Sequence, residues 1–119
     1  MNLGALLPAD RLFDVEHLIA DWGTIKSIMA SPGVYVFRRN GYDAYVGRGD
    51  SDGIARMRKS YRAARYDKTV LFYPATSKRR NYLRECKLYH KLNPCDNERH
   101  PAVPAGANWR CPVKSCPLS

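Results

Sequence analysis

The chain has 119 residues, which suits one compact domain and leaves no room for two independent cores. A hydrophobic content of 45% excludes a disordered chain, and no apolar run approaches the roughly 18 residues that a membrane span needs. The N-terminus carries Asp10, Asp14 and Glu16 without a basic stretch, which argues against a secretory signal. We therefore expect an intracellular, cytoplasmic protein with no membrane partner.

The formal net charge of +9 is concentrated in the middle of the chain. Residues 38–91 hold fifteen Lys or Arg and five Asp or Glu, whereas residues 1–37 hold two and four. Such a basic block indicates a partner rich in phosphate, because each Lys or Arg beside a phosphate releases a condensed counterion. The alternative is a charged surface that only keeps the protein soluble.

The first predicted element is a helical segment, in which apolar residues recur at helical spacing from Leu12 to Met29 after a cap at Asp10. Asn40-Gly41 predicts a hairpin turn. The later pattern predicts strands at 34–38, 44–47 and 69–73, and helices at 54–66 and 78–92. This order indicates an α+β fold in which helices flank a small three-stranded antiparallel sheet.

The chain divides by pattern into three parts. Residues 1–31 are expected to form an N-terminal helical segment packed on the core, and residues 32–98 to form the core itself. Residues 99–119 are rich in Cys and Pro and predict an irregular tail.

Glu85 is the most informative acidic residue, because it falls within the apolar stripe of the 78–92 helix. A carboxylate there is partly desolvated, which is costly unless a cation meets it. That cation is either a basic side chain or a metal ion. One carboxylate is enough to hold Mg²⁺, because this ion keeps most of its water ligands.

Five short motifs occur in a distinctive order: Gly33-Val34-Tyr35, Tyr45-Val46-Gly47, Arg56, Glu85 and Pro94-Cys95-Asp96-Asn97. Over residues 32–97 this order resembles the GIY-YIG nucleases. The resemblance implies that residues 32–98 are a GIY-YIG-like nuclease core. It also implies a metal-dependent endonuclease that hydrolyses phosphodiester bonds of DNA by a one-metal mechanism, with RNA as a further substrate not excluded.

The resemblance also implies roles for single residues. Tyr35 matches the tyrosine that serves as general base for the attacking water, and Tyr45 matches the tyrosine that helps orient water and phosphate. Arg56 matches the arginine that stabilises the pentacovalent phosphate. Glu85 matches the sole carboxylate ligand of one Mg²⁺ or Mn²⁺ ion.

Further positions carry alternatives. Asn97 resembles the residue that braces the site. The family often has a His or Tyr one turn after its arginine, and of the two residues there, Ser60 and Tyr61, we favour Tyr61 as the catalytic one. Because the turn after Gly47 is slightly longer than usual in the family, Arg58 competes with Arg56 for the catalytic role.

The hairpin at Asn40-Gly41 bears on whether both tyrosines reach one site. A two-residue turn pairs Tyr35 with Val46, so that Tyr35 and Tyr45 face opposite sides of the sheet. A three-residue loop with Gly41 left-handed pairs the two tyrosines instead. We therefore expect the three-residue loop.

Basic side chains around these motifs are expected to hold the nucleic-acid backbone. They are Arg48, Arg58, Lys59, Arg62, Lys78, Arg79 and Arg80.

The four cysteines indicate a structural zinc site rather than disulfides, given the expected intracellular location. Cys111 and Cys116 have a plausible ligand spacing for zinc, and Cys86 and His90 share a face of the 78–92 helix. The predicted ligands are Cys86, His90, Cys111 and Cys116, with His100 and Cys95 as rivals. The alternative is a buried apolar Cys86 and free thiols in the tail.

Two other functions fit the same sequence. A nucleic-acid-binding module that has lost catalysis keeps the basic residues and needs neither Glu85 nor the tyrosines. A zinc-containing interaction adaptor needs only the cysteine-rich tail.

Overall fold

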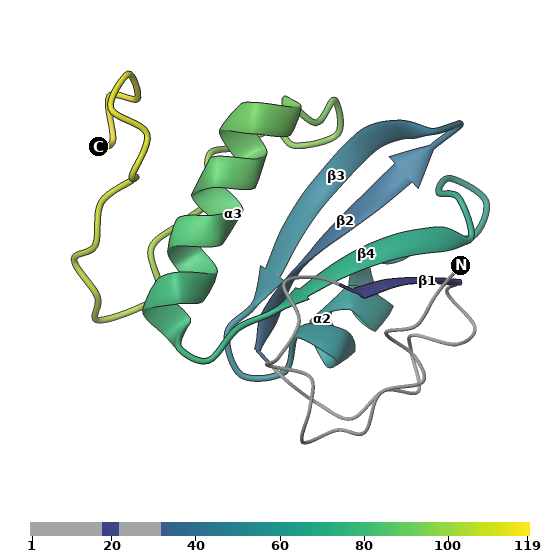
Figure 1. Ribbon diagram of the computed structural model, residues 1–119, viewed down its shortest axis with the longest axis horizontal. Helices are drawn as coiled ribbons and strands as arrows, with labels where there is room; N and C mark the ends of the chain where they lie inside the picture. The colour runs from purple at the N-terminus through teal and green to yellow at the C-terminus, as the bar shows by residue number, and fades with distance from the viewer. Residues whose placement is uncertain (1–17, 22–31) are drawn as a thin grey trace.

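The computed structural model describes residues 18–21 and 32–119. In these ranges it contains four strands and two helices: β1 (Leu18–Asp21), β2 (Gly33–Arg39), β3 (Tyr42–Gly49), α2 (Gly53–Ser60), β4 (Thr69–Pro74) and α3 (Lys78–Leu92). The strands form one antiparallel sheet in the order β1-β4-β2-β3 (Figure 1). The predicted α+β class, the three predicted strands and the presence of the two later helices are confirmed, but the sheet has four strands, with β1 added, in place of the expected three. Within the described residues no helix is long and apolar enough to cross a membrane.

The strand β1 corrects the prediction for the N-terminal segment. Residues 18–21 were expected to be helical, but they pair antiparallel with β4, with Leu18 opposite Phe72 and Asp21 opposite Thr69. This pairing supplies hydrogen-bond partners along the outer side of β4, which would otherwise be an open sheet edge. The rest of the predicted N-terminal helix lies outside the described residues.

The helix α2 ends at Ser60 rather than at residue 66. Asp52 caps its start by accepting a hydrogen bond from the N–H of Ala55 at 3.0 Å. At its end Tyr61 becomes extended, and its ring packs edge-on against Phe37 with the centroids 5.4 Å apart. Burial of this aromatic ring outweighs the weak preference of the following residues for continued helix.

The two helices cover opposite faces of the sheet, as alternation along β2 shows. Tyr35 and Phe37 pack in one apolar cluster with Ile54 and Met57 of α2. The intervening β2 residues, Val34 and Val36, belong to a second cluster that receives Leu88 and Leu92 of α3. Because successive strand residues point to opposite faces, α2 and α3 enclose the sheet between them.

The C-terminal tail packs against the side of α3 that faces away from the sheet (Figure 1). Cys111 and Cys116 are buried there against Tyr82 and Cys86, with Trp109 beside them. Residues 93–119 contain neither helix nor strand, which confirms the irregular tail predicted for residues 99–119.

The hairpin between β2 and β3 has a two-residue turn, so the expected three-residue loop is wrong. Asn40 and Gly41 both have positive φ, 52° and 82°, and Arg39 pairs with Tyr42. These angles match a type I′ turn, whose twist suits antiparallel strands. Both turn N–H groups donate to the carboxylate of Asp67 at 2.9 Å, and these bonds lower the pKa of that carboxyl.

A β-bulge in β3 brings the two tyrosines to one face nonetheless. Ala44 is the extra residue, since the pair Phe37–Tyr45 is followed by a pair that skips it. The bulge shifts the register by one, so that Tyr35 lies opposite Gly47 and not opposite Val46, the partner that a two-residue turn alone would give it. Tyr35 and Tyr45 therefore point to the same side, with ring centroids 6.2 Å apart.

The opposition of Tyr35 and Gly47 leaves no space for a side chain at position 47. A Cβ atom on Gly47 would lie 2.3 Å from Cζ of Tyr35, which is far inside van der Waals contact. The missing side chain of Gly47 thus lets the Tyr35 ring lie across β3.

We expect Gly47→Ala to lower the free energy of unfolding by about 1–3 kcal/mol, because the new methyl group must displace the Tyr35 ring. The measurement is urea denaturation. Gly106→Ala is the control, since nothing lies within 4 Å of its Cβ and only its φ of +83° opposes the change. Placing an L-residue in this left-handed region costs about 1 kcal/mol. A loss at Gly47 no larger than at Gly106 would contradict the packing argument.

Candidate functional site

Four side chains from four different elements line one hollow beside the edge strand β3. Tyr35 comes from β2, Tyr45 from β3, Arg56 from α2 and Glu85 from α3. The hollow has a volume of about 180 Å³ and also borders Gly47, Arg48 and Ala102. The structure thus brings together the four residues to which the resemblance gave the main chemical roles.

Glu85 is the buried acid of this hollow, with 7% of its surface exposed. Its Oε1 atom accepts a hydrogen bond from Nη1 of Arg48 at 2.8 Å. Burial raises the pKa of Glu85 to about 7, and the Arg48 guanidinium limits that rise. The cation expected for this carboxylate is therefore present at one oxygen as a basic side chain.

Arg48 lies inside the protein, although the sequence suggested a contact with the nucleic-acid backbone. Its Nε donates to Asp50 at 2.6 Å, and its Nη2 donates to the carbonyl of Ala102 at 2.7 Å. The guanidinium also lies over the ring of Tyr82, 5.5 Å from the centroid. With these partners Arg48 is a positioning residue for Glu85.

The two tyrosines differ in their surroundings. The hydroxyl of Tyr35 is 2.9 Å from Oγ of Ser60, and burial raises the pKa of Tyr35 to about 12. Ser60 and the nearby Arg56 act against that rise. Burial also raises the pKa of Tyr45, and the negative charge of Glu85 adds to this effect.

The positions that the sequence left open are now separated by geometry. Arg56 lines the hollow, whereas Arg58 does not. Tyr61 is buried against Phe37 and donates its hydroxyl hydrogen to the carbonyl of Asp67 at 3.1 Å. Ser60, not Tyr61, is therefore the neighbour of Tyr35. Spacing alone could not separate these adjacent residues, because the helix ends between them.

Asn97 holds the outer edge of β3. Its Oδ1 accepts from the N–H of Val46 and its Nδ2 donates to the carbonyl of Val46, both at 2.9 Å. These two bonds replace the hydrogen bonds that a neighbouring strand would make with the backbone of Val46 at the sheet edge. Asn97 also lines a wider hollow of about 410 Å³ that continues from Tyr45, Arg56 and Glu85 to residues 98–102.

Sequence reasoning missed two polar anchors of the site. Asp96 accepts hydrogen bonds from Arg39 at 2.8 and 2.9 Å, which keep the pKa of its carboxyl well below the usual range. Asn81 is fully buried one turn before Glu85 and donates to the carbonyl of Gly49 at 3.0 Å. Its spacing of four residues from Glu85 was a readable signal in the sequence.

The other predicted basic residues are exposed. They lie at the end of α2 (Arg58 and Lys59), just after it (Arg62) and at the start of α3 (Lys78, Arg79 and Arg80). The structure also shows a basic hollow of about 470 Å³ along α3. It is lined by Tyr73, Arg80, Leu83, Arg84, Lys87, Leu88 and Lys91.

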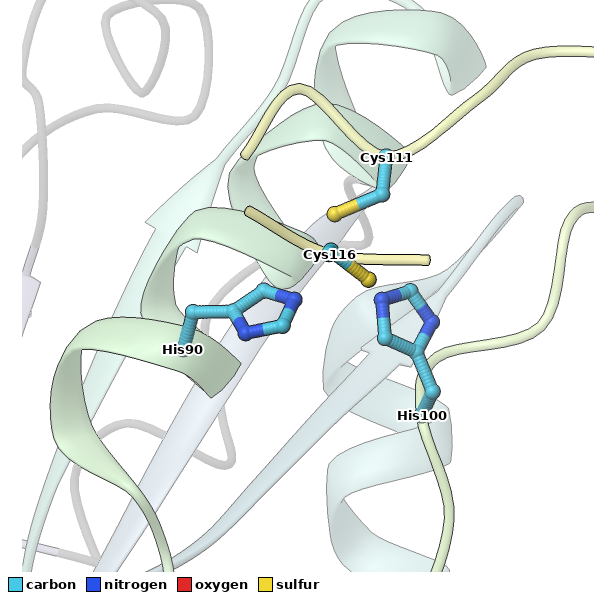
Figure 2. Close-up of side chains that lie close together, drawn as sticks. All are labelled: His90, His100, Cys111 and Cys116. Carbon is cyan, nitrogen blue, oxygen red and sulfur yellow. The ribbon is translucent and has the colours of Figure 1, made fainter. Parts of the chain in front are cut away.

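A second group of ligand-type side chains lies between α3 and the tail (Figure 2). Ligand atoms of His90, His100, Cys111 and Cys116 all lie within 4.8 Å of one another, so this group can hold a metal ion. His100, expected only as a rival, stands where Cys86 was predicted. Cys86 lies outside this group and is buried against Tyr82 and Cys111, and burial raises the pKa of its thiol to about 12.

The contacts of the group fit a metal with nitrogen and sulfur ligands. The Nε2 atoms of His90 and His100 are buried without a hydrogen-bond partner. Nδ1 of His100 donates to the carbonyl of Pro101 at 2.9 Å, which leaves a lone pair on Nε2. The N–H of Leu118 donates to Sγ of Cys116 at 3.4 Å. Two imidazoles and two thiols are compatible with zinc.

No protein-family model, no curated protein and no solved structure matches this chain. The GIY-YIG resemblance therefore rests on the sequence motifs alone.

We expect the free energy of unfolding of the Glu85→Gln variant to increase relative to that of the wild type as the pH rises. The pKa of Glu85 is about 7 in the folded protein against an ordinary 4.5, so the folded protein binds this proton more tightly than the unfolded chain. Between these two values the wild type loses stability with rising pH, whereas glutamine does not titrate.

The measurement is urea denaturation of both proteins at about pH 5 and about pH 8, without added divalent metal. Glutamine keeps the volume and can still accept from Arg48. A difference between the two proteins that does not change with pH would contradict the burial of an ionisable Glu85.

Proposed function

We propose that the protein is a metal-dependent endonuclease that hydrolyses phosphodiester bonds of DNA with one catalytic divalent ion. The observation that carries this proposal is the single hollow lined by Tyr35, Tyr45, Arg56 and Glu85. Two phenols, a guanidinium and one carboxylate supply a base, a phosphate ligand and a metal ligand, which are the groups that phosphodiester hydrolysis needs. The net charge of +9 favours a polyanionic substrate.

In this proposal Tyr35 is the general base. Its phenolate accepts the proton of a water molecule as the water oxygen bonds to phosphorus and the bond from phosphorus to the leaving ester oxygen breaks; the leaving oxygen then takes a proton from solvent. A pKa of about 12 keeps the hydroxyl protonated at neutral pH, so the phenolate depends on the neighbouring positive charge of Arg56 and on a bound cation. Arg56 binds the phosphate oxygens on which negative charge develops.

Glu85 would hold the catalytic Mg²⁺ or Mn²⁺. Within the described ranges, 18–21 and 32–119, its hydrogen bond to Arg48 uses Oε1 alone, so the donor set retains one carboxylate oxygen. A hard cation with one carboxylate and several waters suits that donor. When bound, the ion stabilises charge on the leaving oxygen and favours the phenolate.

We also propose that the metal held by His90, His100, Cys111 and Cys116 is zinc and that it is structural. Thiolate and imidazole ligands select zinc over Mg²⁺ or Mn²⁺. Four protein ligands complete a tetrahedral shell and leave no position for a substrate or a reactive water.

The alternative function is a nucleic-acid-binding module without catalysis. The Arg48–Glu85 ion pair favours it, because a carboxylate that is already paired at 2.8 Å has less need of a metal ion. Nicking assays separate the two functions.

The wild-type protein is expected to nick supercoiled plasmid DNA in the presence of Mg²⁺ or Mn²⁺. Glu85→Gln and Tyr35→Phe should each lower the rate by about 10²-fold or more, because the first removes the carboxylate that would hold the ion and the second removes the proposed base. Arg58→Ala should leave most of the activity, since Arg58 does not line the hollow. Parallel incubation with single-stranded RNA tests the substrate class.

Asp43→Asn is the matched control for the loss of a negative charge. Asp43 pairs with Arg38 at 2.9 Å near the turn of the hairpin. The Asp43→Asn variant should therefore nick plasmid DNA at the same rate as the wild type. Equal nicking by the wild type and by Glu85→Gln would reject the enzyme and favour the binding module.

The basic cluster at the start of α3 is expected to contribute to affinity rather than to catalysis. Replacing Lys78, Arg79 and Arg80 by Gln should weaken DNA binding and lower the slope of log K against log salt by about 0.9 for each phosphate that the variant no longer neutralises. Fluorescence anisotropy over a salt series measures the slope. Lys114→Gln, an exposed change in the tail, should leave it unchanged. An unaltered slope in the triple variant would place the DNA elsewhere.

A further inference from the structure

We propose that zinc bound by His90, His100, Cys111 and Cys116 fixes one wall of the hollow that contains Tyr45, Arg56 and Glu85, and thereby positions Arg48 and Glu85. The wall is residues 98–102, which border the wider hollow. The inference rests on the proposed function only where it treats this hollow as the catalytic site of a nuclease. The metal site and its effect on the wall stand on the contacts alone.

The four ligands come from three separate segments. His90 belongs to α3, His100 belongs to the wall, and Cys111 and Cys116 belong to the tail. Both cysteines are buried, and in Figure 2 both imidazole rings direct a nitrogen toward the sulfur atoms. One ion on these ligands would join all three segments at a single point.

The wall is connected to the catalytic acid by a short chain of contacts. His100 is followed by Pro101, which is buried, and by Ala102. The carbonyl of Ala102 accepts from Nη2 of Arg48 at 2.7 Å, and Nη1 of the same guanidinium donates to Glu85 at 2.8 Å. A displacement of the wall therefore removes one of the partners that orient Arg48.

The metal ion would also be bound by the helix that carries Glu85, at the opposite end of this chain of contacts. His90 follows Glu85 by five positions on α3, within a continuous helix of 15 residues. An ion between His90 and His100 would therefore close a ring that runs through the helix, Glu85, Arg48 and the wall. Rigid ligands on both sides of the hollow would fix its width.

Few other bonds hold the wall. In the part of the chain that the structure describes, the bond from Arg48 to Ala102 is the hydrogen bond that joins residues 98–102 to the rest of the protein. Glu98, Arg99 and Ala102 are exposed. The ring of His100 also packs against the rings of Tyr89 and His90, with centroids 5.3 and 5.2 Å away. A segment with a single hydrogen bond to the rest of the protein opens more readily than a strand or helix unless a further anchor is present.

The first measurement is metal content of the purified full-length protein. About one zinc per chain is expected. Replacement by Co²⁺ should give the intense thiolate absorption of a tetrahedral site. Cys116→Ser should lose the metal, whereas Cys95→Ser should retain it, because Cys95 is exposed and outside the group. A protein without zinc, or equal zinc in both variants, would overturn the inference.

The second measurement is limited proteolysis by trypsin with and without zinc, at constant Mg²⁺. Removal of zinc from the wild type by a chelator that prefers zinc should speed cleavage after Arg99, inside the wall, by about 10-fold or more, because cleavage requires this segment to open. Cleavage after Arg58 and Lys59 of α2 should be unaffected, and this control shows that the protein has stayed folded. The chelated wild type also serves if Cys116→Ser does not fold. Unchanged cleavage after Arg99 following zinc loss would overturn the inference.

The third measurement is plasmid nicking by the same samples. Zinc removal should lower the rate by about 10-fold or more while Mg²⁺ is in excess, as loss of an outer-shell partner does at other sites. A rate independent of zinc would overturn the inference and leave the proposed nuclease intact. If zinc controls cleavage after Arg99 but no sample nicks DNA, the proposed function fails and the metal-fixed wall stands.

Discussion

The buried ion pair between Arg48 and Glu85 is the contact on which the arrangement of the site depends. Both side chains are about nine-tenths buried, at 10% and 9% exposure, and a carboxylate in such a place is stable only beside a cation. Arg48 in turn is held by Asp50, by the carbonyl of Ala102 and by the ring of Tyr82. These contacts direct Glu85 into the hollow, where its charge adds to the effect of burial on Tyr45.

The sheet supplies the other half of the geometry. A single extra residue in β3 sets whether Tyr35 and Tyr45 share a face, because each shift of one residue turns side chains to the other side. The absence of a side chain at Gly47 then allows the Tyr35 ring to cross the edge strand. Small backbone features thus decide whether two phenols and a carboxylate meet.

The two groups of candidate metal ligands offer different donor atoms, and each set of donors suits a different kind of metal ion. Near the tyrosines the donor is one oxygen ligand in an open hollow, which suits a hydrated Mg²⁺ in the proposed nuclease. Behind α3 the donors are two imidazoles and two thiols from three segments, which suit a closed zinc site. The segment 98–102 borders the first site and contributes His100 to the second, so the two sites share one stretch of backbone.

The sequence by itself determined the local elements and the order of the motifs. Ser77 caps α3 and Asn93 ends it in a left-handed conformation, as their residue types predict, because capping depends on a few neighbouring residues. Only the tertiary structure decided the bulge at Ala44, the strand at residues 18–21, the early end of α2 and the exchange of Cys86 for His100. Each of these depends on which distant groups lie opposite, and pairing energy between distant segments leaves no periodic mark in the chain.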